Sequence, residues 1–313
     1  MRISHPMLWV AATRPAFLSV TLVAVMLGLA TARYNGVYHS TWLAGVTLLF
    51  ALVAHAGANV LNDYFDALSG CDAANTERIY PFTGGSRFIQ DGLLSTRQTA
   101  LFGYALLFAV IPAGLYLVSQ SGIGLILIGF CGLFAGWAYS ATPLKLQSRG
   151  IGEITITLAW TLIVVGSDYV QRGTFAAAPI IAGLAYGLLV ANVLFINQVP
   201  DVKADAATGK YTIIVRFGAT IAPLGSALLY ISSTAVLALG ITLGTLPKAS
   251  AVALLFWSTA AFSLKALKTA GENRSLLTQA IKLTIMSCLL FGVLFCVTLI
   301  DGALKFNLRY LAG

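Results

Sequence analysis

Long apolar stretches follow one another along almost the whole chain, separated by short polar segments. Each stretch is roughly 20 residues long, the length at which an α-helix crosses the hydrocarbon core of a bilayer. Backbone polar groups in lipid must be hydrogen-bonded within their own segment, which favours helices. We therefore predict about nine transmembrane helices, over residues 15–32, 41–62, 98–118, 122–142, 152–170, 177–200, 219–243, 248–268 and 281–300.

The composition also indicates a membrane protein. Of the 313 residues, 58% are hydrophobic and 10% are charged, against about 25% charged residues in a typical soluble domain. No change of composition and no long polar linker divides the chain, so residues 1–313 are predicted to form one domain. The predicted fold class is all-α, a polytopic bundle around a central cavity. The four cysteines show no C-x-x-C spacing and indicate neither a disulfide framework nor a metal site.

Charged residues are distributed unequally between the two ends of the predicted helices. Fourteen of the 19 lysines and arginines fall in segments on the same side of the membrane as the N-terminus. By the positive-inside rule, this side is predicted to face the cytoplasm. The predicted location is the plasma (inner) membrane, with multiple passes and the N-terminus inside. The net charge is +8. Because the basic residues sit in short loops between apolar stretches, they indicate topology and anionic ligands or lipid headgroups, and not nucleic acid.

One face of the second predicted helix is polar. His55, Asn59, Asn62 and Asp66 are spaced i, i+4, i+7 and i+11, so they form a single stripe on a helix made mainly of Ala, Val and Leu. A carboxylate costs about 2.5–3.5 kcal/mol at the bilayer midplane and less near an interface, so it persists where something compensates. The stripe is therefore predicted to face the cavity, although His55 taken alone is better explained as a core residue than as a ligand.

The pattern Asn-x-x-x-Asp occurs a second time, from Asn197 to Asp201, at the end of the predicted helix 177–200. Asp205 follows one helical turn later, and Pro200 is expected to bend the helix just before these carboxylates. Both copies lie at the inner end of their helices. The match predicts a pseudo-repeat of two four-helix units that face each other across the cavity.

Carboxylate and amide oxygens without a His or Cys cluster favour Mg²⁺ over zinc. The predicted ligands are Asn62, Asp63, Asp66, Asp72, Asp201 and Asp205. Mg²⁺ typically takes one or two carboxylates together with substrate phosphates, so cations and amides nearby are predicted to bind a diphosphate. The predicted substrate-binding residues are Asn59, Asn62, Arg78, Ser86, Arg87, Asn197 and Lys210. The backbone N–H groups of Gly84-Gly85-Ser86 are a candidate anion nest, with an ordinary turn as the alternative.

The acidic motifs resemble those of the UbiA superfamily of membrane prenyltransferases. The matching segments are Asn62-Asp63-x-x-Asp66 and Asp201-x-x-x-Asp205. The resemblance extends along most of the chain through Arg14-Pro15-x-Phe17, Tyr139-Ser140-x-x-Pro143-x-Lys145, Gly150-x-Gly152-Glu153, Gly209-Lys210-x-Thr212 and Val215-Arg216-Phe217-Gly218. It implies nine helices with the N-terminus inside, and transfer of an isoprenoid chain from a polyprenyl diphosphate to an aromatic acceptor.

The resemblance also implies roles for individual residues. Tyr139 and Lys145 join Asp66, Asp201 and Asp205 as catalytic candidates. Mg²⁺ and cations would stabilise the departing diphosphate, and a dry aromatic wall would shield the allylic cation that remains. The aromatic candidates are Tyr64, Phe65, Tyr139 and Phe195.

Gly70 occupies a position at which the broad family often has a further acid, and Asp72 follows two residues later. This spacing is similar to the branch that prenylates 1,4-dihydroxy-2-naphthoate in menaquinone synthesis. The segment Thr83-Gly84-Gly85-Ser86-Arg87 is unusual for the family. It leaves 4-hydroxybenzoate, homogentisate, chlorophyllide and a glycerol-phosphate lipid as alternative acceptors.

Proteins of three other classes were weighed. A cation-coupled transporter also uses acidic groups and broken helices near an internal repeat, but its sites lie near the midplane, whereas these acids cluster at inner helix ends. A membrane alcohol phosphotransferase needs a tighter Asp-Gly-x-x-Ala-Arg run, which the chain lacks. A non-catalytic accessory protein would not need the intact Asp66, Asp201 and Asp205. The sequence determines neither the chain length of the donor nor the oligomeric state.

Overall fold

The computed structural model describes the backbone of residues 5–311 and the side chains of residues 6–303, and every regular element in this range is a helix. The all-α prediction is confirmed. The long helices are α2 (Leu18–Tyr34), α3 (Thr41–Ser69), α5 (Thr96–Ser121), α6 (Gly124–Ala138), α7 (Gly152–Arg172), α8 (Ala177–Ala207), α10 (Ala222–Thr242), α11 (Trp257–Ala270) and α12 (Arg274–Leu311). The short helices are α1 (His5–Ala12), α4 (Cys71–Ala74) and α9 (Ile213–Phe217), and 3₁₀ turns occur at Pro15–Phe17, Leu146–Arg149, Ala219–Ile221 and Lys248–Phe256.

Within the described residues, 8 helical segments are long and apolar enough to cross a membrane. The chain is therefore a multi-pass membrane protein. The predicted span 122–142 is present as α6, which is apolar but has only 15 residues. Nine full-length spans are thus not confirmed, and the pseudo-repeat stays a prediction.

The two helices that carry the acidic motifs, α3 and α8, continue past their predicted ends. α3 runs to Ser69 and ends where Gly70 adopts a left-handed conformation with φ 78°, as is common at helix C-termini. α8 continues through the buried Pro200 to Ala207, so the predicted end at residue 200 is wrong. A proline removes one backbone hydrogen bond, and packing of the last turns of α8 against α4 and α9 compensates for that loss.

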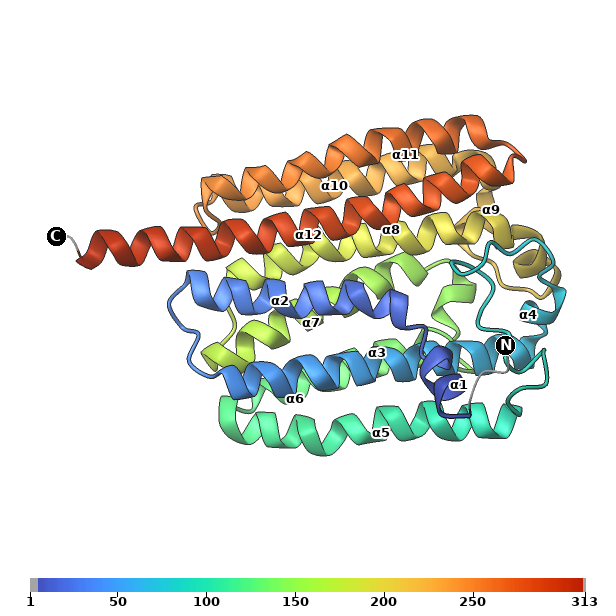
Figure 1. The fold of residues 1–313 in the computed structure, drawn as a ribbon, viewed down its shortest axis with the longest axis horizontal. Helices are drawn as coiled ribbons and strands as arrows, with labels where there is room; N and C mark the ends of the chain where they lie inside the picture. Colours follow the sequence, from blue (N-terminus) through green and yellow to red (C-terminus); the bar gives the residue numbers. More distant parts are fainter. Residues whose placement is uncertain (1–4, 312–313) are drawn as a thin grey trace.

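The helices α7 and α8 form the centre of the bundle. α8 packs against α7, α10, α12 and α2, and α3 packs against α5. Figure 1 shows α10 and α11 on one flank and α5 and α6 on the opposite flank. Gly187 permits the close approach of α7 and α8, because a Cβ atom there would lie 2.5 Å from the carbonyl oxygen of Thr157. The largest core cluster surrounds this contact and includes the fully buried Tyr186, Phe291 and Phe295.

The end of the bundle opposite to α4 and α9 contains a buried ion pair. Asp168 of α7 is fully buried and accepts hydrogen bonds from Arg172 Nε at 2.5 Å and from Thr31 Oγ1 of α2 at 2.9 Å. The adjacent Gln171 Oε1 accepts the backbone N–H of His39 at 3.0 Å. These contacts join α2, α7 and the loop between α2 and α3.

Replacing Asp168 by Asn is expected to lower the free energy of unfolding by about 2 kcal/mol, because the enclosed guanidinium of Arg172 loses its counter-charge. Thermal unfolding in detergent would measure this. Asp91→Asn is the matched control, since Asp91 also lies four residues from an arginine, Arg87, but at 3.9 Å and with a side chain 53% exposed. Exposed pairs contribute little, so equal melting temperatures for the two variants would contradict the prediction.

Candidate active site

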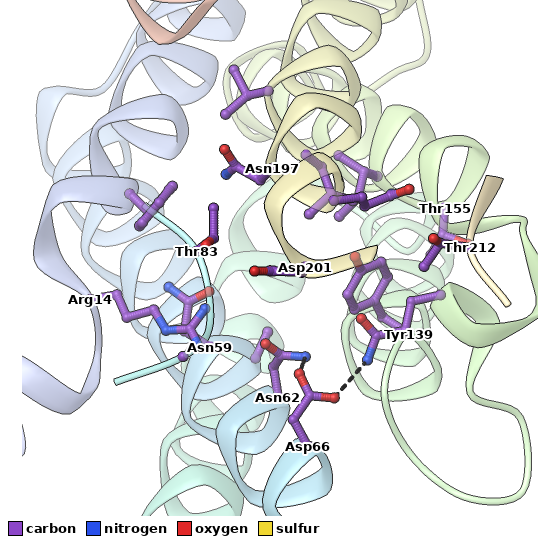
Figure 2. Close-up of a pocket in the computed structure, with 18 of the residues that line it drawn as sticks. Arg14, Asn59, Asn62, Asp66, Thr83, Tyr139, Thr155, Asn197, Asp201 and Thr212 are labelled. Atoms are coloured by element: carbon purple, nitrogen blue, oxygen red, sulfur yellow. Dashed lines mark hydrogen bonds between the residues drawn. The ribbon is translucent and has the colours of Figure 1, made fainter. Parts of the chain in front are cut away.

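Two polar helix faces meet at the end of the bundle that carries α4 and α9. Asn59, Asn62 and Asp66 of α3 lie across from Asn197 and Asp201 of α8, and they line a cavity of about 200 Å³ (Figure 2). We call this space the polar cavity. The helical spacing aligns the polar groups on one face of each helix, so the structure brings together the two segments that the sequence singled out.

Lys210 connects the two acidic segments. Its Nζ lies 3.4 Å from Asp66 Oδ2 and 3.6 Å from Asp205 Oδ1. Its backbone N–H donates to the carbonyl oxygen of Asp205 at 2.8 Å, which fixes the turn after α8. Burial lowers the pKa of the Lys210 ammonium, but the charges of Asp66 and Asp205 outweigh burial and raise the pKa well above its usual value. Lys210 is therefore a permanent cation in the cavity wall.

The loop after α6 is attached to Asp66 through amides and a hydroxyl group. Asn62 Nδ2 donates to Asp66 Oδ2 at 3.1 Å and to Ser140 Oγ at 3.0 Å. Gln147 Nε2 donates to Ser140 Oγ at 3.2 Å and lies 3.5 Å from Asp66 Oδ1. The carboxylate thus has a fixed orientation before any substrate enters.

The loop after α3 holds the carboxylate of Asp201 in the same way. Asn75 Nδ2 donates to Asp201 Oδ1 at 2.7 Å. Arg87 Nη1 in turn donates to the carbonyl oxygen of Asp72 at 2.8 Å, which joins the later part of this loop to α4. Burial raises the pKa of the Asp72 carboxyl, and the negative charge of Asp66 raises it further.

Asp63 is not part of the cavity wall, although it was a predicted metal ligand. It forms an ion pair with Arg14 and accepts the backbone N–H of Ser86 at 3.1 Å. Of the candidate phosphate nest Gly84-Gly85-Ser86, the Ser86 N–H therefore donates to a carboxylate of the protein itself, whereas Gly84 and Gly85 line the polar cavity. Arg14 lies on the cavity wall and connects α2 to the acidic end of α3.

Several predicted site residues lie outside the polar cavity, namely Asp63, Arg78, Ser86, Arg87 and Lys145. Arg78 Nη1 donates to the carbonyl oxygen of Gly85 at 3.4 Å, and its guanidinium lies 5.5 Å from the ring centroid of Tyr80. Lys145 precedes the turn Leu146–Arg149 with φ 43°. These cations are on loops, where helical periodicity gives no information about the direction of a side chain. Of the four predicted aromatic residues, Tyr139 alone lines the cavity among the described residues.

The structure adds residues that the sequence interpretation did not place in the site: Arg14, Asn75, Thr83, Gln147, Trp160 and Gln198. Arg14 was noted only as part of the matching segment Arg14-Pro15-x-Phe17. Trp160 lies in a transmembrane segment without a charged neighbour in sequence, and it reaches the site because α7 packs against α3. Its ring contacts His55 edge-on, with centroids 5.0 Å apart.

The donors around the polar cavity fit Mg²⁺ by chemistry. Among the described residues, no group of three His, Cys, Asp or Glu side chains forms a preassembled metal site. Mg²⁺ needs no such group, because it takes one or two carboxylates together with phosphate oxygens and water. Asp72 Oδ2, Asn75 Oδ1 and Asn197 Oδ1 are buried without a hydrogen-bond donor, an unfavourable state that a cation would relieve.

A second, apolar space adjoins the polar cavity. It has a volume of about 350 Å³, lies among α3, α5, α6 and α7, and shares His55, Ala58, Gly136, Ala159 and Trp160 with the polar cavity. We call it the apolar groove. Its lining is almost entirely hydrophobic and extends through the bundle toward the opposite end of the helices. A polar headgroup site thus continues directly into a channel for a hydrocarbon chain.

The fold is a membrane-embedded helix bundle in which a polar cavity and an apolar groove join. The family model of the UbiA prenyltransferase family matches residues 18–286, so the chain belongs to this family. The family resemblance of the sequence is thereby confirmed, and the chain is a prenyltransferase by class.

Curated relatives carry related names. The chain is 29% identical over 246 residues to the 1,4-dihydroxy-2-naphthoate octaprenyltransferase of Escherichia coli (strain K12). The matched region covers 76% of this chain and 77% of the relative. It is 29% identical over 230 residues to the 2-carboxy-1,4-naphthoquinone phytyltransferase of Synechocystis sp., covering 72% of this chain and 70% of the relative.

Solved structures share the fold. A UbiA homolog from Archaeoglobus fulgidus, solved with DMAPP and Mg²⁺ bound, has a TM-score of 0.64 at 17% identity and covers 92% of this chain and 98% of its own. The apo structure of a UbiA homolog from Aeropyrum pernix K1 has a TM-score of 0.65 at 15% identity, covering 90% and 98%.

Proposed function

We propose that this chain transfers an isoprenoid chain from a polyprenyl diphosphate to 1,4-dihydroxy-2-naphthoate, as in menaquinone synthesis. The observation that carries the proposal is the direct continuity between the polar cavity and the apolar groove. A diphosphate with a long hydrocarbon tail fits both spaces at once. Relatives named as naphthoate prenyltransferases favour this acceptor, and a cation-coupled transporter does not account for the family match.

The donor headgroup would be bound at the acidic end of the polar cavity. Asn62, Asp66, Asp72, Asp201 and Asp205 would hold Mg²⁺, which neutralises diphosphate charge and stabilises it as a leaving group. Lys210 and Arg14 add fixed positive charge on the cavity wall, and Asn75 keeps Asp201 in place. The charges of the protein are thus arranged before the substrate binds, which is the condition for strong electrostatic stabilisation.

Bond exchange then follows from the arrangement of the two spaces. The C1–O bond of the donor breaks, and its electron pair leaves with the diphosphate. The ring electrons of the acceptor form the new bond to C1, and the ring carboxylate leaves as CO₂. Tyr139 and Trp160 offer aromatic faces near the junction of the two spaces, where cation–π attraction and exclusion of water protect the allylic cation.

The orientation of the bundle in the membrane is inferred from the distribution of its lysines and arginines. The loops at the end that holds the polar cavity carry most of the lysines and arginines, so this end is proposed to face the cytoplasm. The proposed location is the plasma (inner) membrane. The diphosphate would then enter from the cytoplasmic side, and the product would leave sideways into the bilayer.

The decisive experiment measures prenyl transfer in proteoliposomes. Geranylgeranyl diphosphate is offered with 1,4-dihydroxy-2-naphthoate, 4-hydroxybenzoate and homogentisate, with Mg²⁺ or with EDTA. We expect prenylated naphthoate-derived product only with Mg²⁺. Product from another acceptor would replace the proposed acceptor, and product that survives EDTA would contradict the proposed metal. Folded protein that binds no diphosphate and forms no product would contradict the reaction itself.

The apolar groove gives a further prediction. A Cβ atom at Gly132 of α6 meets no other atom within 4 Å, although Gly132 lines the groove. Gly132→Leu is therefore expected to place its side chain in the groove and to lower kcat/KM for a long-chain donor by about tenfold, while geranyl diphosphate is affected less. Gly45→Leu is the matched control, because Gly45 is also open but lies outside the groove. An equal loss for both donors would contradict the proposed path of the chain.

A further inference from the structure

Gln198 of α8 has one half of its amide fixed and the other half without a partner. Its Nε2 donates to Glu153 Oε1 at 2.6 Å, a short charge-assisted hydrogen bond. Its Oε1 is buried and has no donor. Because a carboxylate accepts and does not donate, the bond to Glu153 determines which end of the amide is the nitrogen. The carbonyl oxygen of Gln198 is therefore the group left to accept a hydrogen bond.

Glu153 is in an unusual position for a carboxylate. It is 8% exposed at the first turn of α7, and no lysine or arginine among the described residues pairs with it. The positive end of the helix dipole favours a carboxylate in this turn. The carboxylate accepts hydrogen bonds from its own backbone N–H and from Gln198, so Gln198 is the side chain that the buried acid holds.

The pair lies beside the polar cavity, where α7 packs against α8. Gln198 lines the cavity together with Tyr139 and Thr155, and Figure 2 shows Tyr139 and Thr155 on the α7 side of α8. Tyr139 is close to the start of α7, since a Cβ atom at Gly152 would lie 3.5 Å from Tyr139 Cε2. Thr155 Oγ1 donates to the carbonyl oxygen of Ile151 at 2.9 Å, so it too has accepting capacity left.

We propose that Gln198, held by Glu153, is the specificity-determining residue that accepts a hydrogen bond from a free hydroxyl group on the aromatic acceptor. This inference rests on the proposed prenyl transfer. The electron-rich ring would bind between the α7 side of the cavity and the donor C1, with its hydroxyl group directed at Gln198 Oε1. Glu153 is a positioning residue, because without its charge the amide is free to rotate and present its nitrogen.

A site that accepts a hydrogen bond from a substrate hydroxyl discriminates strongly against an analogue that lacks the proton, because the buried oxygen then stays unpaired. The acceptor probes are 1,4-dihydroxy-2-naphthoate and its two monomethyl ethers, which keep the ring electron-rich. We expect wild-type protein to prefer the free dihydroxy acid over one of the ethers by roughly 100-fold or more in kcat/KM.

Gln198→Met removes the accepting oxygen at similar size, and it is expected to bring that ratio to within about tenfold. The KM for the donor diphosphate should stay unchanged. Glu153→Gln is expected to lower the ratio by a smaller factor, and to lower it no further when combined with Gln198→Met, since it acts through Gln198. The ratio is insensitive to partial misfolding, which reduces both rates equally.

An unchanged ratio in Gln198→Met, with prenylated product still formed, would overturn the role of Gln198. An effect of Glu153→Gln that persists in full without Gln198 would overturn the positioning role. Wild-type protein that binds the donor but prenylates no aromatic acceptor would instead overturn the proposed function, and the inference with it.

Discussion

Replacing Asp66 by Ala is expected to lower kcat/KM for prenyl transfer by about 10³-fold. Asp66 is the carboxylate at which the most contacts converge, since Asn62, Gln147 and Lys210 all reach it. Its loss removes a proposed metal ligand and leaves Lys210 with Asp205 as its remaining carboxylate partner. Product formation from a labelled donor in proteoliposomes measures the effect.

The appropriate control is Asp91→Ala, an acid in the same region of the chain that is half exposed and outside the polar cavity. It should retain activity close to wild type. The Mg²⁺ concentration needed for half-maximal rate should also rise in Asp66→Ala if residual activity allows its measurement. Asp66→Ala protein with wild-type rate and Mg²⁺ dependence would remove Asp66 from the site.

Replacing Lys210 by Met is expected to lower kcat/KM for the donor by about 10²-fold. The side chain of Lys210 is the cation that lies between Asp66 and Asp205, and its raised pKa keeps it charged throughout the working pH range. Without it, the two carboxylates repel each other and the departing diphosphate loses a positive charge. The loss should appear in the KM for the donor as well as in kcat, and little in the KM for the acceptor.

Lys203→Met is the matched control, because Lys203 lies in the last turns of α8, shortly before Lys210, and also pairs with an acid, Glu77. Its side chain is 72% exposed, and such pairs contribute little. Lys210→Arg should recover part of the activity, since it restores the charge with a different shape. A loss in Lys203→Met equal to that in Lys210→Met would show that the effect is not local to the cavity.

The positions of the helices could be predicted because the bilayer imposes a simple rule on each segment separately. Every predicted span is present as a helix, and the start of α8 at residue 177 was predicted to the residue. The ends of α3 and α8 were predicted too early, because their last residues are polar. Polar residues after a long apolar stretch are usually interpreted as a loop outside the membrane. These last residues remain helical because they line an internal cavity and bond to other loops, as Asn75 does to Asp201.

Side chains that line the polar cavity could be predicted where they lie on a helix, and not where they lie on a loop. The residues on helical stripes, Asn59, Asn62 and Asp66 on α3 and Asn197 and Asp201 on α8, lie where their spacing indicates. The residues on loops were predicted by residue type alone. That reasoning placed Lys210 in the site and also placed there Arg78, Arg87 and Lys145, which bind backbone or lie elsewhere.

The sequence by itself determined the multi-pass membrane character, the helices and the two acidic faces, because hydrophobic length and helical periodicity are properties of one segment at a time. The class of the protein was indicated by the resemblance of its motifs to a known family. The tertiary structure alone decided which polar groups meet. It paired Asp63 with Arg14, placed Lys210 between two carboxylates, and fixed the amide of Gln198 with Glu153. These contacts join residues far apart in the chain, and their geometry depends on how the helices pack, which no local pattern contains.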